Sequence, residues 1–167
     1  MDGSPRALAA TVLVAVILLG AALPPPAAAG DHPIPQRWVG TWRLTSEEFV
    51  DPAGAPAGSL FADTVGKLTY AARGDVWALV GSPTDPAGAI WYTGTAEVHR
   101  RAGVVVHHVQ YSSLAAWTGT DLVRAYEFFA RDKRLRLSAE VTPELTDILE
   151  WRRAGPRWAG PLRPAHR

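Results

Sequence analysis

The sequence predicts an all-β protein, specifically an eight-stranded antiparallel up-and-down barrel. From Trp38 onward, apolar and polar residues alternate in short runs, which is the period of a β-strand. Clusters of Gly, Pro and Asp separate these runs, and no long amphipathic helix lies between them. Eight strands joined in sequence order can close on themselves and leave no exposed edge. An open sheet or a sandwich is the alternative with the same strand pattern.

The first 29 residues have the layout of a signal peptide. Arg6 precedes an apolar run over residues 8–23, and three prolines and small residues follow. The run is shorter than the roughly 20 residues with which a helix spans a bilayer. We therefore expect a Sec-type signal cleaved between Ala29 and Gly30, a secreted or extracytoplasmic protein, and no stable membrane insertion after cleavage. Retention of the segment as an anchor is the alternative.

The mature chain is expected to hold one domain. Residues 30–37 form an N-terminal linker, residues 38–153 the barrel, and residues 154–167 a disordered, basic, Pro-rich tail. Segments 51–63 and 81–89 carry Pro and Gly and are predicted as surface loops, which either frame the mouth of the barrel or only connect strands. The strands are expected at residues 38–50, 64–70, 75–80, 90–99, 104–112, 121–130, 134–141 and 145–153.

Composition excludes several classes of site. The chain has no cysteine, so disulfides, thiolate metal sites and a cysteine nucleophile are ruled out. A formal net charge of +1 provides no global field for nucleic acid. No Gly-rich phosphate loop, nucleophile elbow or acidic calcium cluster is recognisable. We expect neither a cofactor nor a metal.

Arg124, Tyr126 and Phe128 are candidate ligand-binding residues. Alternation places their side chains on one face of a strand, and the tight turn that follows aligns them with apolar residues of the next strand. An arginine that points into an apolar interior is costly unless it is paired. Its partner is expected to be an internal carboxylate such as Glu48, carbonyls at a strand end, or an anionic group of a ligand.

His107 and His108 are adjacent, so they point to opposite faces and cannot share a metal ion. A two-residue turn at Arg101-Ala102 would turn His107 inward, whereas a bulge at Gly103 would turn His108 inward. The glycine favours the bulge, so we predict that His108 faces the interior. There it is a candidate ligand-binding residue and, with Tyr126, a candidate proton carrier. A hydrogen-bonded core histidine is the alternative.

Several short motifs resemble those of bacterial and fungal lipocalin-like domain proteins. They are Gly40-Thr41-Trp42, Gly66-x-Leu68-Thr69-Tyr70, Tyr92-x-Gly94-Thr95-x-Glu97-Val98, Trp117-x-Gly119-Thr120-Asp121 and Leu149-Glu150-Trp151-x-Arg153. The resemblance implies a calycin-type barrel with structural roles for Gly40, Trp42 and Arg153. It suggests that Arg152 or Arg153 stacks on Trp42 at the closed end. Segment 81–89 is short for the family, which favours a smaller or more open cavity.

Binding of a small hydrophobic or amphipathic molecule in the barrel cavity is the function we favour from the sequence. A cofactor-free isomerase or cyclase that uses His108 and Tyr126 is the enzymatic alternative. A barrel whose interior is completely filled, acting as a scaffold without a ligand, is the third hypothesis.

Overall fold

The computed structural model describes residues 33–155 and confirms a closed, eight-stranded, antiparallel up-and-down barrel. A ninth, short strand and one turn of 3-10 helix, η1 (Ala115–Trp117), are added to it. The predicted signal peptide and the tail after residue 155 lie outside the described residues. The strands are β1 (Gly40–Val50), β2 (Pro56–Gly58), β3 (Val65–Tyr70), β4 (Asp75–Ser82), β5 (Asp85–His99), β6 (Val104–Ser112), β7 (Asp121–Phe129), β8 (Arg134–Thr142) and β9 (Leu145–Arg153).

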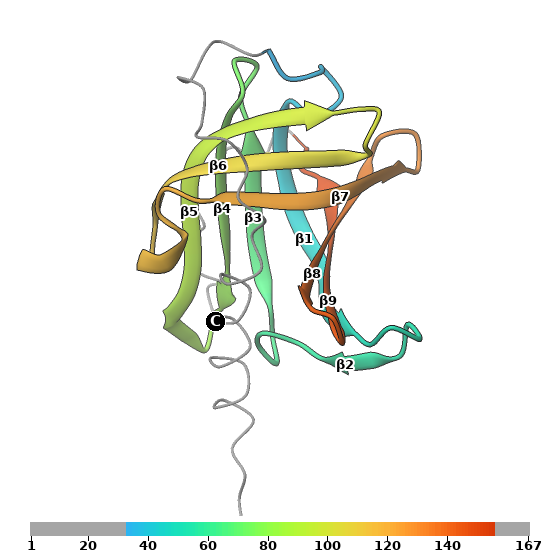
Figure 1. Ribbon diagram of the computed structural model, residues 1–167. Coiled ribbons are helices and arrows are strands. Elements are labelled where there is room, and N and C mark those ends of the chain that lie inside the picture. The colour runs from blue at the N-terminus through green and yellow to red at the C-terminus, as the bar shows by residue number, and fades with distance from the viewer. Residues whose placement is uncertain (1–32, 156–167) are drawn as a thin grey trace, which may run out of the picture.

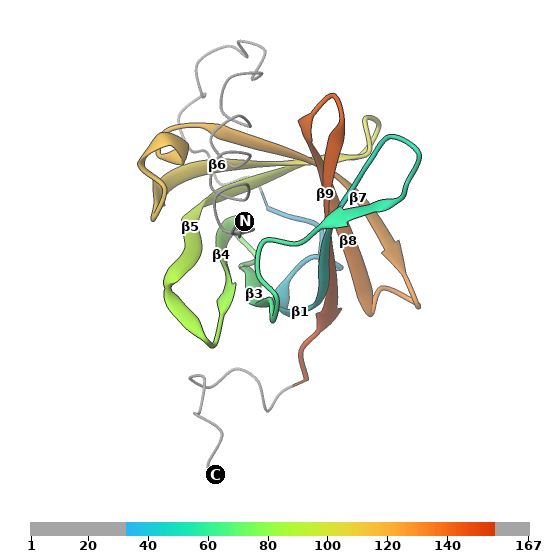
Figure 2. The same ribbon diagram turned by 90° about the horizontal axis from the view of Figure 1, so that it is seen from below.

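The barrel closes where β1 pairs with both β3 and β9. Trp42 lies opposite Leu68 on one side and Arg153 on the other. Strands β6 and β7 cross in front of β3 and β4 (Figure 1). The end at the top and upper right of Figure 1 carries residues 33–39 and the turns at 71–74, 100–103 and 130–133, and we call it the upper end. The lower end, onto which Figure 2 looks, carries β2 and the connections at 83–84, 113–120 and 143–144.

Aromatic side chains fill the upper half of the barrel. Trp38 is fully buried, and its ring meets those of Tyr126, Phe128 and Tyr70 edge-on at centroid distances of 4.8, 4.9 and 5.3 Å. The sequence pattern predicts that Trp38 begins the first strand, but β1 begins at Gly40. The backbone N–H of Trp38 donates to the Pro35 carbonyl in a turn ahead of β1, and Ile34 is also buried, so residues 34–38 pack on the barrel.

Arg153 seals the same end. Its guanidinium lies 4.2 Å from the centre of the Trp42 ring and donates to the backbone carbonyls of Val39, at 2.7 Å, and Arg37. The Trp42 indole N–H in turn donates to the Trp38 carbonyl at 2.9 Å. A Cβ at Gly40 would stand 3.2 Å from Arg153 Nη1. The upper end is therefore closed by side chains and backbone together.

The two predicted loops are more ordered than the sequence indicated. Most of segment 81–89 belongs to β4 and β5, which meet in a two-residue turn at 83–84. The loop prediction for this segment is wrong, because its Pro and Gly residues are compatible with the end of a strand. Pro86 lies where β5 has no partner on its β6 side, since that pairing begins at Tyr92, and an edge tolerates proline. In segment 51–63, β2 folds back on β1.

Replacing Gly94 by alanine should destabilise the fold by about 1–3 kcal/mol. A Cβ at this position would lie 2.0 Å from the carbonyl oxygen of His108, beside the irregularity in the β5–β6 pairing. The neighbouring atom is backbone, so the ladder itself must shift. Urea unfolding measures the loss. Gly155→Ala is the control, because nothing lies within 4 Å of a Cβ there, and equal stabilities of the two variants would contradict this packing.

Candidate functional site

A cluster of polar side chains lies inside the barrel, surrounded by apolar residues. Its five members come from five strands: Tyr70 of β3, Tyr92 of β5, His107 of β6, Arg124 of β7 and Asp147 of β9. Each occupies an inward position of its strand. Buried polar groups are costly unless they are paired, so their grouping in one interior makes this cluster the candidate site.

His107 is the centre of the cluster and is fully buried. Its Nε2 lies 2.8 Å from the Tyr70 hydroxyl, and its Nδ1 lies 2.7 Å from the Tyr92 hydroxyl. Burial, aided by the nearby Arg124 cation, lowers the pKa of His107 to about 3. The imidazole is therefore neutral at ordinary pH and has one N–H and one acceptor nitrogen.

The prediction that His108 faces the interior is wrong. His99 pairs with Val104 across a four-residue turn. A turn with an even number of residues, whether two or four, gives the same inward and outward alternation, so His107 lies opposite Ala96 on the inner face. Gly103 adopts a φ of 68° within that turn and adds no residue to the ladder. His108 lies on the outer face, where its Nδ1 is 2.7 Å from Asp121 Oδ1.

Arg124 faces the interior and pairs with Asp147. The distance between Arg124 Nη1 and Asp147 Oδ2 is 3.4 Å, and the two side chains retain 11% and 12% of their exposure. Glu48, the partner suggested by the sequence, lies on the exposed outer face of β1. Asp147 was missed as a site residue, although it shares a strand face with Leu149 and Trp151 and alternation alone could have placed it inside.

The interior favours the charged form of Arg124 but acts against that of Asp147. Burial disfavours the Arg124 cation, but the neighbouring Tyr92 and Asp147 outweigh this effect and raise its pKa. Burial raises the pKa of Asp147, and Arg124 opposes that shift. Arg124 also lies beside the Tyr92 hydroxyl, whose pKa burial raises. When both groups are ionised, their opposite charges compensate each other inside the barrel.

Two buried polar atoms near the lower end have no hydrogen-bond partner among residues 33–155. They are Asp147 Oδ1 and the indole nitrogen of Trp117, which belongs to η1 and packs on Tyr92 at a centroid distance of 6.1 Å. One is an acceptor and the other a donor. The indole nitrogens of Trp38 and Trp151 are unpaired as well, so an indole alone marks no site. An unpaired buried polar group costs about 1–3 kcal/mol, and more when it is charged, so Asp147 Oδ1 is the atom at which a further polar group would be accommodated.

A second buried carboxylate, Glu47, fastens the connection that follows β2. It accepts hydrogen bonds from Leu60 N at 2.9 Å and Thr64 Oγ1 at 3.2 Å, and another from Ser59. Burial raises the pKa of Glu47, and the charge of Asp147 adds to the shift. The segment around residue 60 is thereby held beside the lower end of the interior.

Tyr126 and Phe128 share the inner face of β7 with Arg124 but pack in the upper half against Trp38. Arg37 lies over the Phe128 ring at 4.7 Å. The structure thus does not bring Tyr126 and His108 together, and the proposed pair of proton carriers is not assembled. Both residues belong to places other than the polar cluster.

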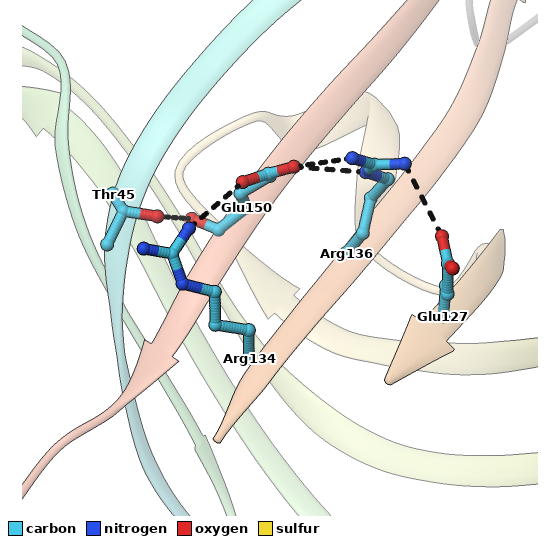
Figure 3. A network of polar contacts seen from close by, with 5 residues as sticks. All are labelled: Thr45, Glu127, Arg134, Arg136 and Glu150. Carbon is cyan, nitrogen blue, oxygen red and sulfur yellow. Dashed lines mark hydrogen bonds and ion pairs between the residues drawn. The ribbon is translucent and has the colours of Figure 1, made fainter. Parts of the chain in front are cut away.

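The outer face carries a conventional ion-pair network, which serves as a reference for the inner pair. Glu150 accepts from Arg136 at 2.7 Å and lies 3.7 Å from Arg134, while Arg136 also reaches Glu127 (Figure 3). The Arg136 and Glu150 side chains are 44% and 20% exposed. A hollow of about 260 Å³ lined by Arg43, Arg152 and Arg153 lies at the β1–β9 seam, away from the polar cluster.

Within residues 33–155, no group of three or more His, Asp or Glu side chains is arranged to hold a metal ion. The same part of the chain has no helix long and apolar enough to cross a membrane.

Two solved structures resemble this fold at low sequence identity. The lipoprotein YedD from Klebsiella pneumoniae subsp. pneumoniae has 11% identity and a TM-score of 0.43, over 75% of this chain and 78% of that chain. A de novo designed fluorescence-activating β-barrel has 14% identity and a TM-score of 0.41, over 71% of this chain and 95% of that chain. No protein-family model matches the sequence, and no curated protein does. The functional argument therefore depends on the barrel interior.

The buried imidazole predicts a pH dependence of stability. The unfolded chain takes up a proton near pH 6.5, whereas folded His107 does so only at about pH 3, so stability falls as the pH falls below 6.5. Between pH 7 and pH 5 this linkage costs about 2 kcal/mol. Urea unfolding at both values should show that His107→Gln loses about 2 kcal/mol less than the wild type. Equal losses would mean that the imidazole reaches solvent.

Proposed function

We propose that this protein is a lipocalin-like carrier that binds a small hydrophobic or amphipathic molecule in the lower half of its barrel. The observation that carries the proposal is the unpaired Asp147 Oδ1 beside Arg124, within a polar cluster that apolar residues surround. Small-molecule sites are mostly apolar and contain a few polar groups that fix the orientation of the ligand. The upper end is sealed by Trp38, Trp42 and Arg153, so the ligand enters from the lower end.

We further propose that the protein works outside the cytoplasm. The charged, apolar and small-residue segments of residues 1–29 support export. The absence of cysteine fits a barrel whose stability comes from packing rather than disulfides.

Native mass spectrometry of the protein, purified without denaturation from a host that secretes it, tests the proposal. The expected result is a stoichiometric small molecule that is released on unfolding. The double variant Arg124→Met/Asp147→Leu should lose it, whereas the outer-face variant Arg136→Met/Glu150→Leu should retain it. A protein without bound molecules that also takes up no lipophile would favour the scaffold hypothesis.

A further inference from the structure

The hydrogen bonds of the polar cluster have a direction. Neutral His107 donates through one ring nitrogen and accepts through the other. Among the described residues, the buried Tyr70 hydroxyl contacts no hydrogen-bonding group except His107 Nε2. If Tyr70 accepted a hydrogen bond from Nε2, its own proton would be buried without an acceptor. With the imidazole proton on Nδ1, Tyr70 donates to Nε2 and the Tyr92 proton is the one left without an acceptor. Only Tyr92 lies beside the unpaired Asp147 Oδ1, where a bound group can take that proton, and this favours Nδ1.

This tautomer leaves the hydroxyl proton of Tyr92 without an acceptor. His107 Nδ1–H donates to the Tyr92 oxygen at 2.7 Å, so the Tyr92 proton is left to donate elsewhere. Tyr92 and Asp147 both lie beside Arg124, and Asp147 Oδ1 has no donor among residues 33–155. The Tyr92 hydroxyl, a donor without an acceptor, and Asp147 Oδ1, an acceptor without a donor, thus lie on either side of the Arg124 guanidinium.

We infer that the ligand of the barrel is an uncharged, apolar molecule that bears a hydroxyl group. The hydroxyl accepts a hydrogen bond from Tyr92 and donates one to Asp147 Oδ1. This inference rests on the proposed function and adds the chemical class of the ligand. It also restricts the role of Arg124, which is a positioning residue for Asp147 and not the partner of an anionic ligand.

The charged residues already present inside the barrel disfavour a charged ligand. Arg124 is already neutralised by Asp147 at 3.4 Å, and the second carboxylate, Glu47, acts on Asp147 from the same region. An added carboxylate would meet these two acidic groups and lose its hydration. An added ammonium would face the buried Arg124 cation. A hydroxyl satisfies both unmet groups and introduces no charge.

Three small probes of similar size separate the possibilities: benzyl alcohol, toluene and benzoate. In a purely apolar cavity toluene binds best, because the hydroxyl of benzyl alcohol must give up its hydrogen bonds to water. The inference predicts that benzyl alcohol binds the wild type more tightly than either of the other probes. Tyr92→Phe should reduce the ratio of benzyl alcohol to toluene affinity by at least about tenfold.

Two double variants control for folding. Arg124→Met/Asp147→Leu removes both charges together and should also favour toluene. Arg136→Met/Glu150→Leu makes the same replacements on the outer face and should keep the wild-type ratio. Affinities are measured by ligand-detected NMR titration of the full chain, and the thermal unfolding of each variant is recorded in parallel.

The tautomer of His107 gives a readout that needs no ligand. Nitrogen-15 NMR of the free protein should find the proton on Nδ1, and a proton on Nε2 would overturn the inference. Binding of toluene and benzyl alcohol with a ratio that Tyr92→Phe leaves unchanged would also overturn it, while the proposed carrier function would stand. Tightest binding of benzoate would overturn it in favour of an anionic ligand. If no probe binds and the native protein holds no molecule, the carrier function fails as well.

Discussion

Replacement of Asp147 alone by leucine should destabilise the folded protein by about 3–5 kcal/mol. The variant leaves the Arg124 guanidinium inside the barrel, beside the Tyr92 and Tyr70 hydroxyls and the neutral His107 but without its carboxylate. The interior cannot supply the hydration that the cation had in the unfolded chain. Urea unfolding at neutral pH measures the loss of stability.

The double variant Arg124→Met/Asp147→Leu should recover most of that loss, because a buried ion pair is often replaced by apolar groups at little cost. The outer network provides the comparison. Glu150→Leu removes the partner of the exposed Arg136 and should cost only about 1 kcal/mol, since water can solvate the guanidinium that remains (Figure 3). If Asp147→Leu were as mild as Glu150→Leu, Arg124 would not be the buried cation described above.

Replacement of Trp42 by alanine should cost a further large amount, about 3–5 kcal/mol. The ring is fully buried, packs near Phe128 at a centroid distance of 5.8 Å, and carries the Arg153 guanidinium on its face. Its removal leaves a cavity at the upper end and takes away the surface on which Arg153 is held.

Trp91→Ala is the matched control for this variant. Trp91 is 39% exposed on the outer face of β5, so its truncation removes little buried surface and should cost well under half as much. Thermal unfolding of both variants measures the difference. An unchanged melting curve for Trp42→Ala would contradict the closed upper end.

The fold could be predicted from the sequence because strand alternation and short turns are local signals. Residues 104–112, 134–141 and 145–153, for example, agree with the observed strands within one residue. The prediction of segment 81–89 as a loop was wrong because whether a residue can join a strand depends there on the neighbouring strand. Pro86 is permitted in β5 only because β6 does not extend that far, and no local pattern contains that information.

The candidate site was predictable only in part, for a similar reason. Alternation identified Arg124 as an inward cation, but its partner comes from β9 and their contact depends on closure of the barrel. The choice between His107 and His108 depended on the parity of one turn, and a single added residue reverses every side chain of the strand. The Tyr70–His107–Tyr92 chain joins three strands, so no motif marks it in the sequence.

A crystal structure of the secreted protein, as purified and before any ligand is added, tests the central claim most directly. The account predicts density larger than a water molecule inside the lower half of the barrel, within hydrogen-bonding distance of Asp147 Oδ1 and the Tyr92 hydroxyl. An interior in which apolar side chains fill that space and Asp147 turns outward to solvent would contradict it.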